Sequence, residues 1–119
     1  MRVMVIGASA DRRKFGNVAV RAYLAQGHEV LPVNPKGGEI EGVRVFASIG
    51  DVPGAIDRAS LYLAREGGIQ AVRELAARGD VGELWLNPGA DDGDVVAEAE
   101  RLGLTVIRAC SIAAIDASA

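Results

Sequence analysis

Short runs of apolar residues alternate along this chain with stretches in which apolar residues recur at helical spacing, and glycines mark most of the joints. The almost continuous apolar character of residues 3–6 indicates a strand buried on both faces, as in a parallel sheet. The periodic stretches predict helices over residues 17–26, 69–76 and 91–102, with one helical turn between Ser48 and Pro53. The apolar runs predict strands over residues 3–6, 29–33, 43–46, 61–64, 84–86 and 104–107.

The order of these elements predicts the fold class. Strand and helix alternate throughout, which requires right-handed crossovers between parallel strands and helices on both faces of the sheet. We therefore expect a single Rossmann-like α/β domain over residues 1–119, with three layers and a mostly parallel sheet of about five to six strands. At the ends of the first helix, Asn17 is the expected N-cap and Gly27 the expected residue after the C-cap.

Composition narrows the class of protein further. Half of the 119 residues are hydrophobic but only 4% are aromatic, so we expect an aliphatic core that also contains Trp85. The 13 basic and 16 acidic side chains leave a net charge of −3, which argues against a nucleic-acid partner. The one cysteine excludes an internal disulfide framework and a CxxC zinc site. Because no apolar run approaches roughly 18 residues and no leader-like segment precedes the first strand, we expect no membrane contact and a cytoplasmic location.

Ligands of open parallel α/β sheets bind at the carboxyl ends of the strands, near the point where the strand order reverses. This rule selects four loops, at residues 7–16, 34–38, 64–68 and 87–89. Both lysines of the chain, Lys14 and Lys36, lie in these loops, together with Arg12, Arg13 and Arg65. Loops are polar by default, but the placement of both lysines favours a phosphate-binding role.

The first loop does not carry the dinucleotide-binding fingerprint. That motif requires glycines at the positions of Gly7, Ser9 and Arg12, and only the first of them is present. Gly7 still allows a sharp turn after the strand, and the amide groups at the start of the next helix can hold a phosphate. The alternative is that Gly7 serves the turn alone.

A cation follows the second predicted strand, in the segment Asn34-Pro35-Lys36. Domains that bind NAD usually carry an acidic residue there, which contacts the ribose 2′-hydroxyl. Lys36 instead suits a phosphorylated ribose, which is found with a 2′-phosphate in NADP and with a 3′-phosphate in coenzyme A. The residues alone leave both ligands open.

Several segments carry a resemblance to a known family. They are Val5–Ser9, Gly27–Lys36, Trp85–Ala90 and Gly103–Ile107 with the following Cys110. Together they resemble the small bacterial and archaeal coenzyme A-binding domain proteins, which are similar to the nucleotide-binding half of the succinyl-CoA synthetase α subunit. The likeness extends from about Arg2 to Ile112 and is most specific in Val33–Lys36. The chain departs from the family pattern at Asn87, where glutamine is usual, and at Ala109, where arginine is usual.

The resemblance implies a Rossmann-type domain whose small-molecule ligand is coenzyme A or an acyl-CoA. It also implies a homodimer or an acyl-CoA enzyme as the protein partner. By position, the pyrophosphate would be held by Gly7, Ala8, Ser9 and Lys14. The adenosine and its 3′-phosphate would meet Asn34, Pro35 and Lys36. The pocket near the adenine or the pantetheine would be lined by Ala64 and Arg65.

The remaining reactive side chains do not predict catalysis. His28 precedes the second strand and is expected at the edge of the sheet away from the ligand. Cys110 follows the last strand, where it is either a small buried hydrophobe or a thiol near the cofactor. Asp91, Asp92 and Asp94 lie at a helix start, where carboxylates complement the helix dipole, and we expect no metal there. Since no nucleophile–base pair stands out, the sequence predicts a binding module that is not an enzyme.

Three functions from different classes remain. The first is a protein that binds coenzyme A or an acyl-CoA and acts as a sensor or regulatory partner in acyl-CoA metabolism. The second is an NADP-binding, oxidoreductase-like module, which would need a substrate domain that 119 residues leave no room for. The third is a ligand-free scaffold for protein interaction, in which Lys14 and Lys36 would be dispensable.

Overall fold

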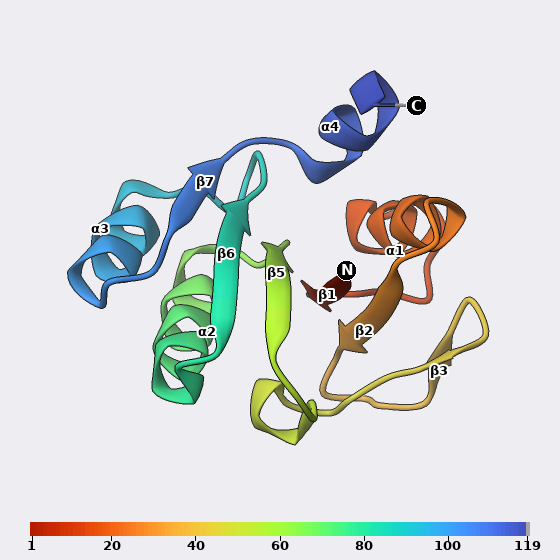
Figure 1. Cartoon of the computed structure of the whole chain (residues 1–119), viewed down its shortest axis with the longest axis horizontal. Coiled ribbons are helices and arrows are strands. Elements are labelled where there is room, and N and C mark those ends of the chain that lie inside the picture. Colours follow the sequence, from red (N-terminus) through yellow and green to blue (C-terminus); the bar gives the residue numbers. More distant parts are fainter. Residues whose placement is uncertain (119) are drawn as a thin grey trace.

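Five parallel strands form a central sheet with helices on both of its faces (Figure 1). The computed structural model describes the backbone of residues 1–118 and the side chains of residues 1–116. The strands of the sheet are β1 (Arg2–Ile6), β2 (Glu29–Val33), β5 (Ile56–Leu61), β6 (Val81–Leu86) and β7 (Val106–Arg108). A short antiparallel ribbon comprises β3 (Glu39–Ile40) and β4 (Val43–Arg44). The helices are α1 (Phe15–Ala25), α2 (Arg65–Arg78), α3 (Gly93–Arg101), α4 (Ser111–Ser118) and the 3-10 turn η1 (Ile49–Asp51).

The strands lie in the order β2-β1-β5-β6-β7, and each neighbouring pair is parallel. From β1 the chain winds outward to β2 and then crosses back to β5, so the strand order reverses between β1 and β5. This arrangement is a doubly wound sheet, and it confirms the predicted Rossmann-like, three-layer α/β fold. The predicted strand over residues 43–46 is not part of the sheet. Its first two residues form β4 of the ribbon, and Phe46 makes a single bridge to Val33 in β2.

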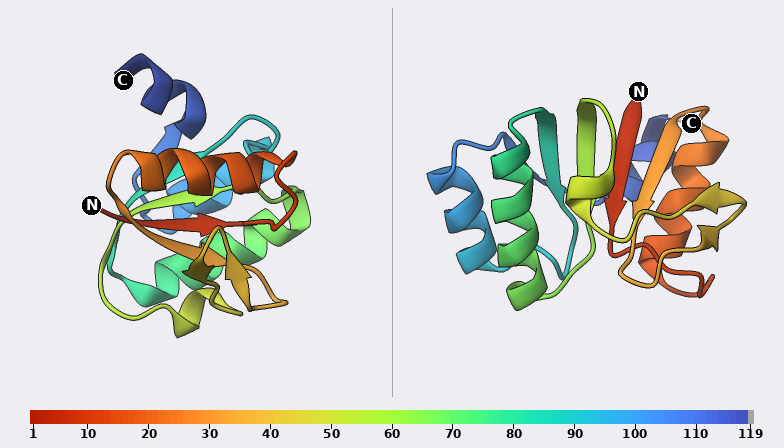
Figure 2. Two further views of the ribbon diagram at one scale, coloured as in Figure 1. Left: turned by 90° about the vertical axis from the view of Figure 1, so that its right-hand side faces the viewer. Right: turned by 90° about the horizontal axis from the view of Figure 1, so that it is seen from below.

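Helices α1 and α4 cover one face of the sheet, and α2, α3 and η1 cover the other (Figure 2). Side chains of β1 alternate between these layers, because Val3 and Val5 pack in the cluster of α1 whereas Met4 and Ile6 pack in the cluster of α2. Both faces of β1 are therefore apolar, which explains its continuous hydrophobic run. None of the helices within residues 1–118 has the length and apolar character needed to cross a membrane.

Two of the predicted boundaries that differ from the structure have a clear physical cause. Helix α1 begins at Phe15, so Asn17 is not its N-cap; the buried Asn17 amide instead donates to the carbonyl oxygen of Ser9 at 2.9 Å. Strand β5 runs from residue 56 to 61 and not over residues 61–64. Its first half contains Asp57 and Arg58, which break the apolar pattern because both side chains have partners at the rim of the sheet.

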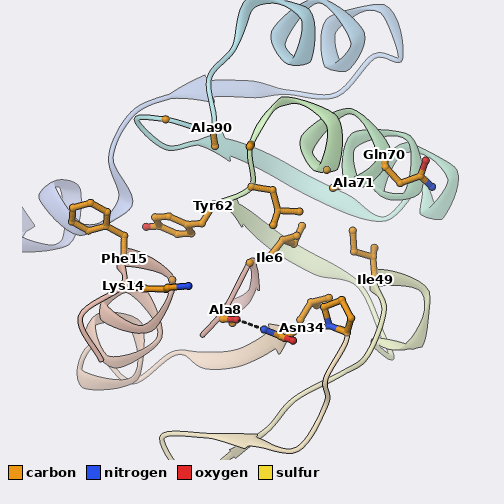
Figure 3. Close-up of a pocket in the computed structure, with 18 of the residues that line it drawn as sticks. Ile6, Ala8, Lys14, Phe15, Asn34, Ile49, Tyr62, Gln70, Ala71 and Ala90 are labelled. Atoms are coloured by element: carbon orange, nitrogen blue, oxygen red, sulfur yellow. Dashed lines mark hydrogen bonds between the residues drawn. The ribbon is translucent and has the colours of Figure 1, made fainter. Parts of the chain in front are cut away.

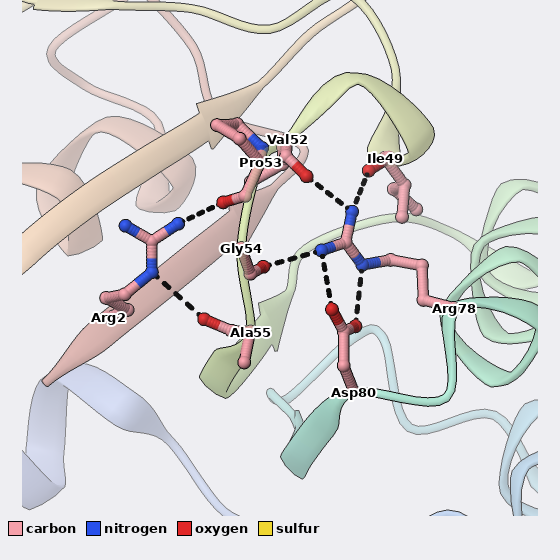
Figure 4. A network of polar contacts seen from close by, with 8 residues as sticks. All are labelled: Arg2, Ile49, Val52, Pro53, Gly54, Ala55, Arg78 and Asp80. Carbon is pink, nitrogen blue, oxygen red and sulfur yellow. Dashed lines mark hydrogen bonds and ion pairs between the residues drawn. The ribbon is translucent and has the colours of Figure 1, made fainter.

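Arg78, near the end of α2, holds the segment that precedes β5 (Figure 4). Its guanidinium donates to the carbonyl oxygens of Ile49 at 2.9 Å, Val52 at 2.7 Å and Gly54 at 2.8 Å, and it pairs with Asp80 at 3.0 Å. These bonds attach η1 to α2 and satisfy carbonyl groups that lie outside the sheet ladder. Since Ile49 of η1 also borders the carboxyl edge of the sheet, Arg78 helps to shape that edge.

Candidate functional site

A groove of about 840 Å³ opens at the carboxyl edge of the sheet (Figure 3). The ends of β1, β2, β5 and β6 form its floor, and η1 and the first turns of α1 and α2 form its walls. It therefore lies at the reversal point between β1 and β5, where the fold rule places a ligand. Its size is in the range of small-molecule and cofactor sites.

Two glycines bring the backbone of the first loop unusually close to its neighbours. Gly7 has a φ of +88°, and a Cβ atom there would lie 2.9 Å from the carbonyl oxygen of Tyr62. A Cβ atom on Gly16 would lie 2.2 Å from the carbonyl oxygen of Gly7, so only glycine allows α1 to start directly against this loop. The sequence pattern points to Gly7 but not to Gly16, which serves the close-packing role of the last glycine in a dinucleotide loop.

The start of α1 is suited to an anion. Its N-cap residue, Lys14, makes no side-chain capping bond, and no acidic residue lies in the first turn. Arg13 is held by Asp11 at 3.1 Å, and this pair raises the pKa of Arg13 and lowers the pKa of Asp11. The Lys14 ammonium group has no ion-pair or hydrogen-bond partner among the side chains of residues 1–116, and it lines the groove. The positive end of the α1 dipole and the Lys14 ammonium group therefore both favour an anion at the start of this helix.

Asn34 joins the first loop to the loop after β2. Its amide nitrogen donates to the carbonyl oxygen of Ala8 at 2.8 Å (Figure 3). Its Oδ1 accepts from the backbone N–H of Lys36 at 2.9 Å. Asn34, Pro35 and Ala8 line the groove, whereas Ser9 and Lys36 lie beside its lining. The Lys36 side chain is exposed, and no partner for its ammonium group is found in the described part of the chain.

The third loop contributes one of its two candidate residues to the groove lining. Ala64 lines the groove, but Arg65 does not, because its guanidinium turns toward α3 and pairs with Asp94 at 2.7 Å. That pairing raises the pKa of Arg65. The groove is lined instead by one stripe of α2, whose members share a face at helical spacing: Gly67, Gln70, Ala71 and Glu74. In the sequence, only the position of α2 directly after β5 could have indicated that residues of this helix line the groove.

Asn87, after β6, has a structural role. It is fully buried; its amide nitrogen donates to Ser60 Oγ and to the Leu61 carbonyl oxygen, each at 2.9 Å, and its Oδ1 accepts from the N–H of Ser111 at 2.8 Å. Asn87 therefore fixes β5, β6 and the start of α4 relative to one another. The residues that follow it, Pro88, Gly89 and Ala90, line the groove.

The other reactive side chains lie outside the groove lining. His28 is at the amino edge of the sheet, where its Nδ1 is 3.0 Å from the terminal amino group, and burial with the nearby positive charges lowers its pKa. Cys110 is half-buried, and its Sγ accepts from the N–H of Ala113 at 3.5 Å. Asp92 caps α3 through the N–H of Asp94, which confirms the helix-start interpretation. Trp85 is only partly buried and does not belong to the core as expected; the Arg58 guanidinium lies 4.1 Å from its ring centre.

A doubly wound sheet with a basic glycine loop at its reversal point defines the class of nucleotide-binding α/β domains. Within that class, residues 1–116 match the family model described as a CoA binding domain, and the chain belongs to this family. The resemblance identified in the sequence is thereby confirmed.

Relatives of known sequence or structure agree with this placement. The chain is 28% identical over 115 residues to the α subunit of the ADP-forming acetate–CoA ligase II of Pyrococcus furiosus, and the match covers 88% of this chain and 25% of that subunit. It is 26% identical over 106 residues to the uncharacterized protein YneT of Bacillus subtilis, covering 89% and 78% of the two chains. The solved structure of a hypothetical protein from Pyrococcus horikoshii OT3 shares the fold, with a TM-score of 0.87, 22% identity and coverage of 98% and 81%. The chain thus spans about a quarter of the length of the ligase subunit.

Proposed function

We propose that this protein binds coenzyme A, free or as an acyl thioester, in the groove at the carboxyl edge of its sheet. The observation that carries the proposal is the available Lys14 ammonium group at the uncapped start of α1, inside a groove of a CoA binding domain. The pyrophosphate lies against the backbone of Gly7, Ala8 and Ser9 and near Lys14. Backbone amides and a cation are the usual partners of phosphate at such a loop.

The adenosine and its 3′-phosphate belong to the loop after β2. Pro35 offers an apolar surface in the groove, Asn34 holds the loop in place, and Lys36 extends a cation beyond the lining. At the other end of the groove, Phe15 is 70% exposed and lies beside Tyr62 (Figure 3). These two rings, next to Lys14, suit the pantetheine arm. Arg65 is left out of the site because Asp94 holds it.

The role of this chain is then that of a CoA-binding module that works with an acyl-CoA enzyme as a sensor or regulatory partner, without a catalytic step of its own. The ligase subunit that it resembles is one part of a larger enzyme, and this chain corresponds to about a quarter of that subunit. No residue of the groove is assigned a catalytic role. A partner enzyme would supply the chemistry.

Titration calorimetry with Lys36→Ala tests the assignment of the 3′-phosphate. A charge-assisted contact is worth about 1.5–3 kcal/mol, so CoA affinity should fall by roughly 10- to 100-fold while dephospho-CoA affinity stays nearly constant. Arg101→Ala, which removes the same charge from α3 outside the groove, is the matched control and should change neither affinity. Equal losses for both ligands in Lys36→Ala would contradict the assignment. A wild-type protein that binds NADPH but not CoA would overturn the proposed function in favour of the NADP alternative.

A further inference from the structure

The groove has two chemically different ends. Lys14 and Phe15 lie at one end, whereas Ile49, Gln70 and Ala71 lie at the other, with Ile49 on η1 and the last two on α2 (Figure 3). The second end, which we call the α2–η1 slot, is lined by apolar side chains and bordered by polar ones. The apolar members are Val33, Pro35, Ile49 and Ala71, and the polar members are Ser48, Gln70 and Glu74.

Glu74 is the unexpected member of this lining. Its side chain is exposed and makes no ion pair or hydrogen bond with any side chain of residues 1–116, although most other charged side chains of α2 and α3 are paired. Gln70 lies one helical turn before it on the same stripe of α2. A carboxylate and an amide thus border a groove whose other charged lining residues are the cations Arg13 and Lys14.

A carboxylate beside a polyanionic ligand is unfavourable unless it accepts hydrogen bonds from that ligand. Coenzyme A has a strong pair of donors remote from its phosphates, the exocyclic amino group of adenine. The base is also flat and largely apolar on its faces, which suits the space between the Ile49 and Ala71 walls. Lys36 follows Pro35 at the same end, so a 3′-phosphate held there places the adjoining base in the α2–η1 slot.

We infer that Glu74 determines specificity for adenine: its carboxylate accepts a hydrogen bond from the exocyclic amino group of a base held in the α2–η1 slot, and the Gln70 amide contacts the same edge of the base. This inference rests on the proposed function and adds to it the residue that selects the base. Arg78 acts as a positioning residue, since its bond to the Ile49 carbonyl oxygen holds one wall of the slot against α2.

The test compares CoA with its hypoxanthine analogue, in which a carbonyl oxygen replaces the exocyclic amino group. A carboxylate repels that oxygen, so wild-type protein should prefer CoA by about tenfold or more in titration calorimetry. Glu74→Gln keeps the size of the side chain but can donate to a carbonyl oxygen, and the preference should fall below about threefold. Glu66→Gln is the matched control, because this exposed glutamate is also on α2 but lies outside the groove lining. It should retain the wild-type preference.

The outcomes separate this inference from the function on which it rests. If wild-type protein binds CoA and its hypoxanthine analogue equally, or if Glu74→Gln keeps the full preference, the role of Glu74 is overturned while CoA binding stands. That role is also overturned if Glu74→Gln weakens the binding of 4′-phosphopantetheine, since Glu74 would then contact the other arm of the ligand. If wild-type protein binds no CoA, the proposed function itself fails and the inference falls with it.

Discussion

At the scale of single residues, the shape of the site depends on places where a side chain is absent. The first turn of α1 can approach the loop after β1 because Gly16 leaves room for the carbonyl oxygen of Gly7. That approach directs the helix start and Lys14 into the groove. If α1 started farther from the loop after β1, both Lys14 and the positive end of the helix dipole would lie farther from the strand ends.

Gly16→Ala should therefore destabilise the protein. The added Cβ atom would lie 2.2 Å from backbone, which cannot move aside as a flexible side chain does. Overpacking of this kind costs about 1–3 kcal/mol, measurable as a lower free energy of unfolding in urea. The variant should also bind CoA more weakly, because α1 must shift.

Gly93→Ala is a suitable control for this effect. Gly93 is the first residue of α3, and nothing lies within 4 Å of the position that its Cβ atom would take. Alanine there should leave the free energy of unfolding unchanged or raise it by up to about 1 kcal/mol. Equal behaviour of the two variants would show that the close approach at Gly16 does not constrain the fold.

Residues of the candidate site differ in how readily the sequence reveals them. The places of Lys14 and Asn34 in the groove lining could be predicted, since charge and turn chemistry beside a strand end are local features. Gly16 and Glu74 could not. The importance of Gly16 depends on a contact with Gly7 across the loop, and that of Glu74 depends on which face of α2 meets η1. Both are properties of packing between elements.

At the scale of elements, α3 supports the helix that carries one wall of the groove. Arg73 of α2 pairs with Glu98 of α3 at 2.7 Å, and Arg101 pairs with the same carboxylate at 2.6 Å. Hydrogen bonds from Arg101 and Arg73 lower the pKa of Glu98 to about 2 from its ordinary 4.5. The folded state thus favours the charged form of Glu98 more than the unfolded state does.

This pKa shift predicts a pH dependence of stability. A lowered carboxyl pKa stabilises the folded state fully above about pH 4.5, and this contribution is lost as the pH falls toward 2. Glu98→Gln should accordingly lower the free energy of unfolding at pH 7, and its difference from wild type should shrink between about pH 5 and pH 2. Urea denaturation at a series of pH values measures both quantities.

Glu100→Gln provides the comparison, because Glu100 is an exposed carboxylate of the same helix for which no ion pair is found within residues 1–116. Its free energy of unfolding should follow the wild-type pH profile. If Glu98→Gln also follows that profile, the two arginines do not stabilise the carboxylate in solution.

The boundaries of an element can be predicted best where its local pattern of apolar and polar residues extends over the whole element. Residues 29–33 form β2 as expected, and Gly27 ends α1 with a φ of +80°. The start of β5 escapes prediction because Asp57 and Arg58 lie at the amino rim of the sheet, where polar side chains find partners. The apolar pattern therefore places the strand at Leu61–Ala64, of which only the first residue belongs to it.

At the scale of the whole molecule, the groove joins the two layers that the sheet separates. Its lining includes Lys14 and Phe15 from the α1 side and Gln70, Ala71 and Glu74 from the α2 side. A ligand that extends along the groove contacts both layers at once. Its binding free energy therefore stabilises the complete fold, because unfolding of either layer destroys the site.

Coenzyme A should accordingly raise the melting temperature as a single transition. At a hundredfold excess over its dissociation constant, a ligand that binds only the folded state adds about 2.7 kcal/mol, which corresponds to roughly 10 °C in a domain of this size. Dephospho-CoA at the same concentration should give a smaller shift, since Lys36 loses its partner. NADH, which has neither a 3′-phosphate on its adenosine ribose nor a pantetheine arm, should give the smallest shift. A larger shift with NADPH than with CoA would instead indicate that the groove takes a 2′-phosphorylated dinucleotide, and no shift with any ligand would favour the protein-interaction scaffold.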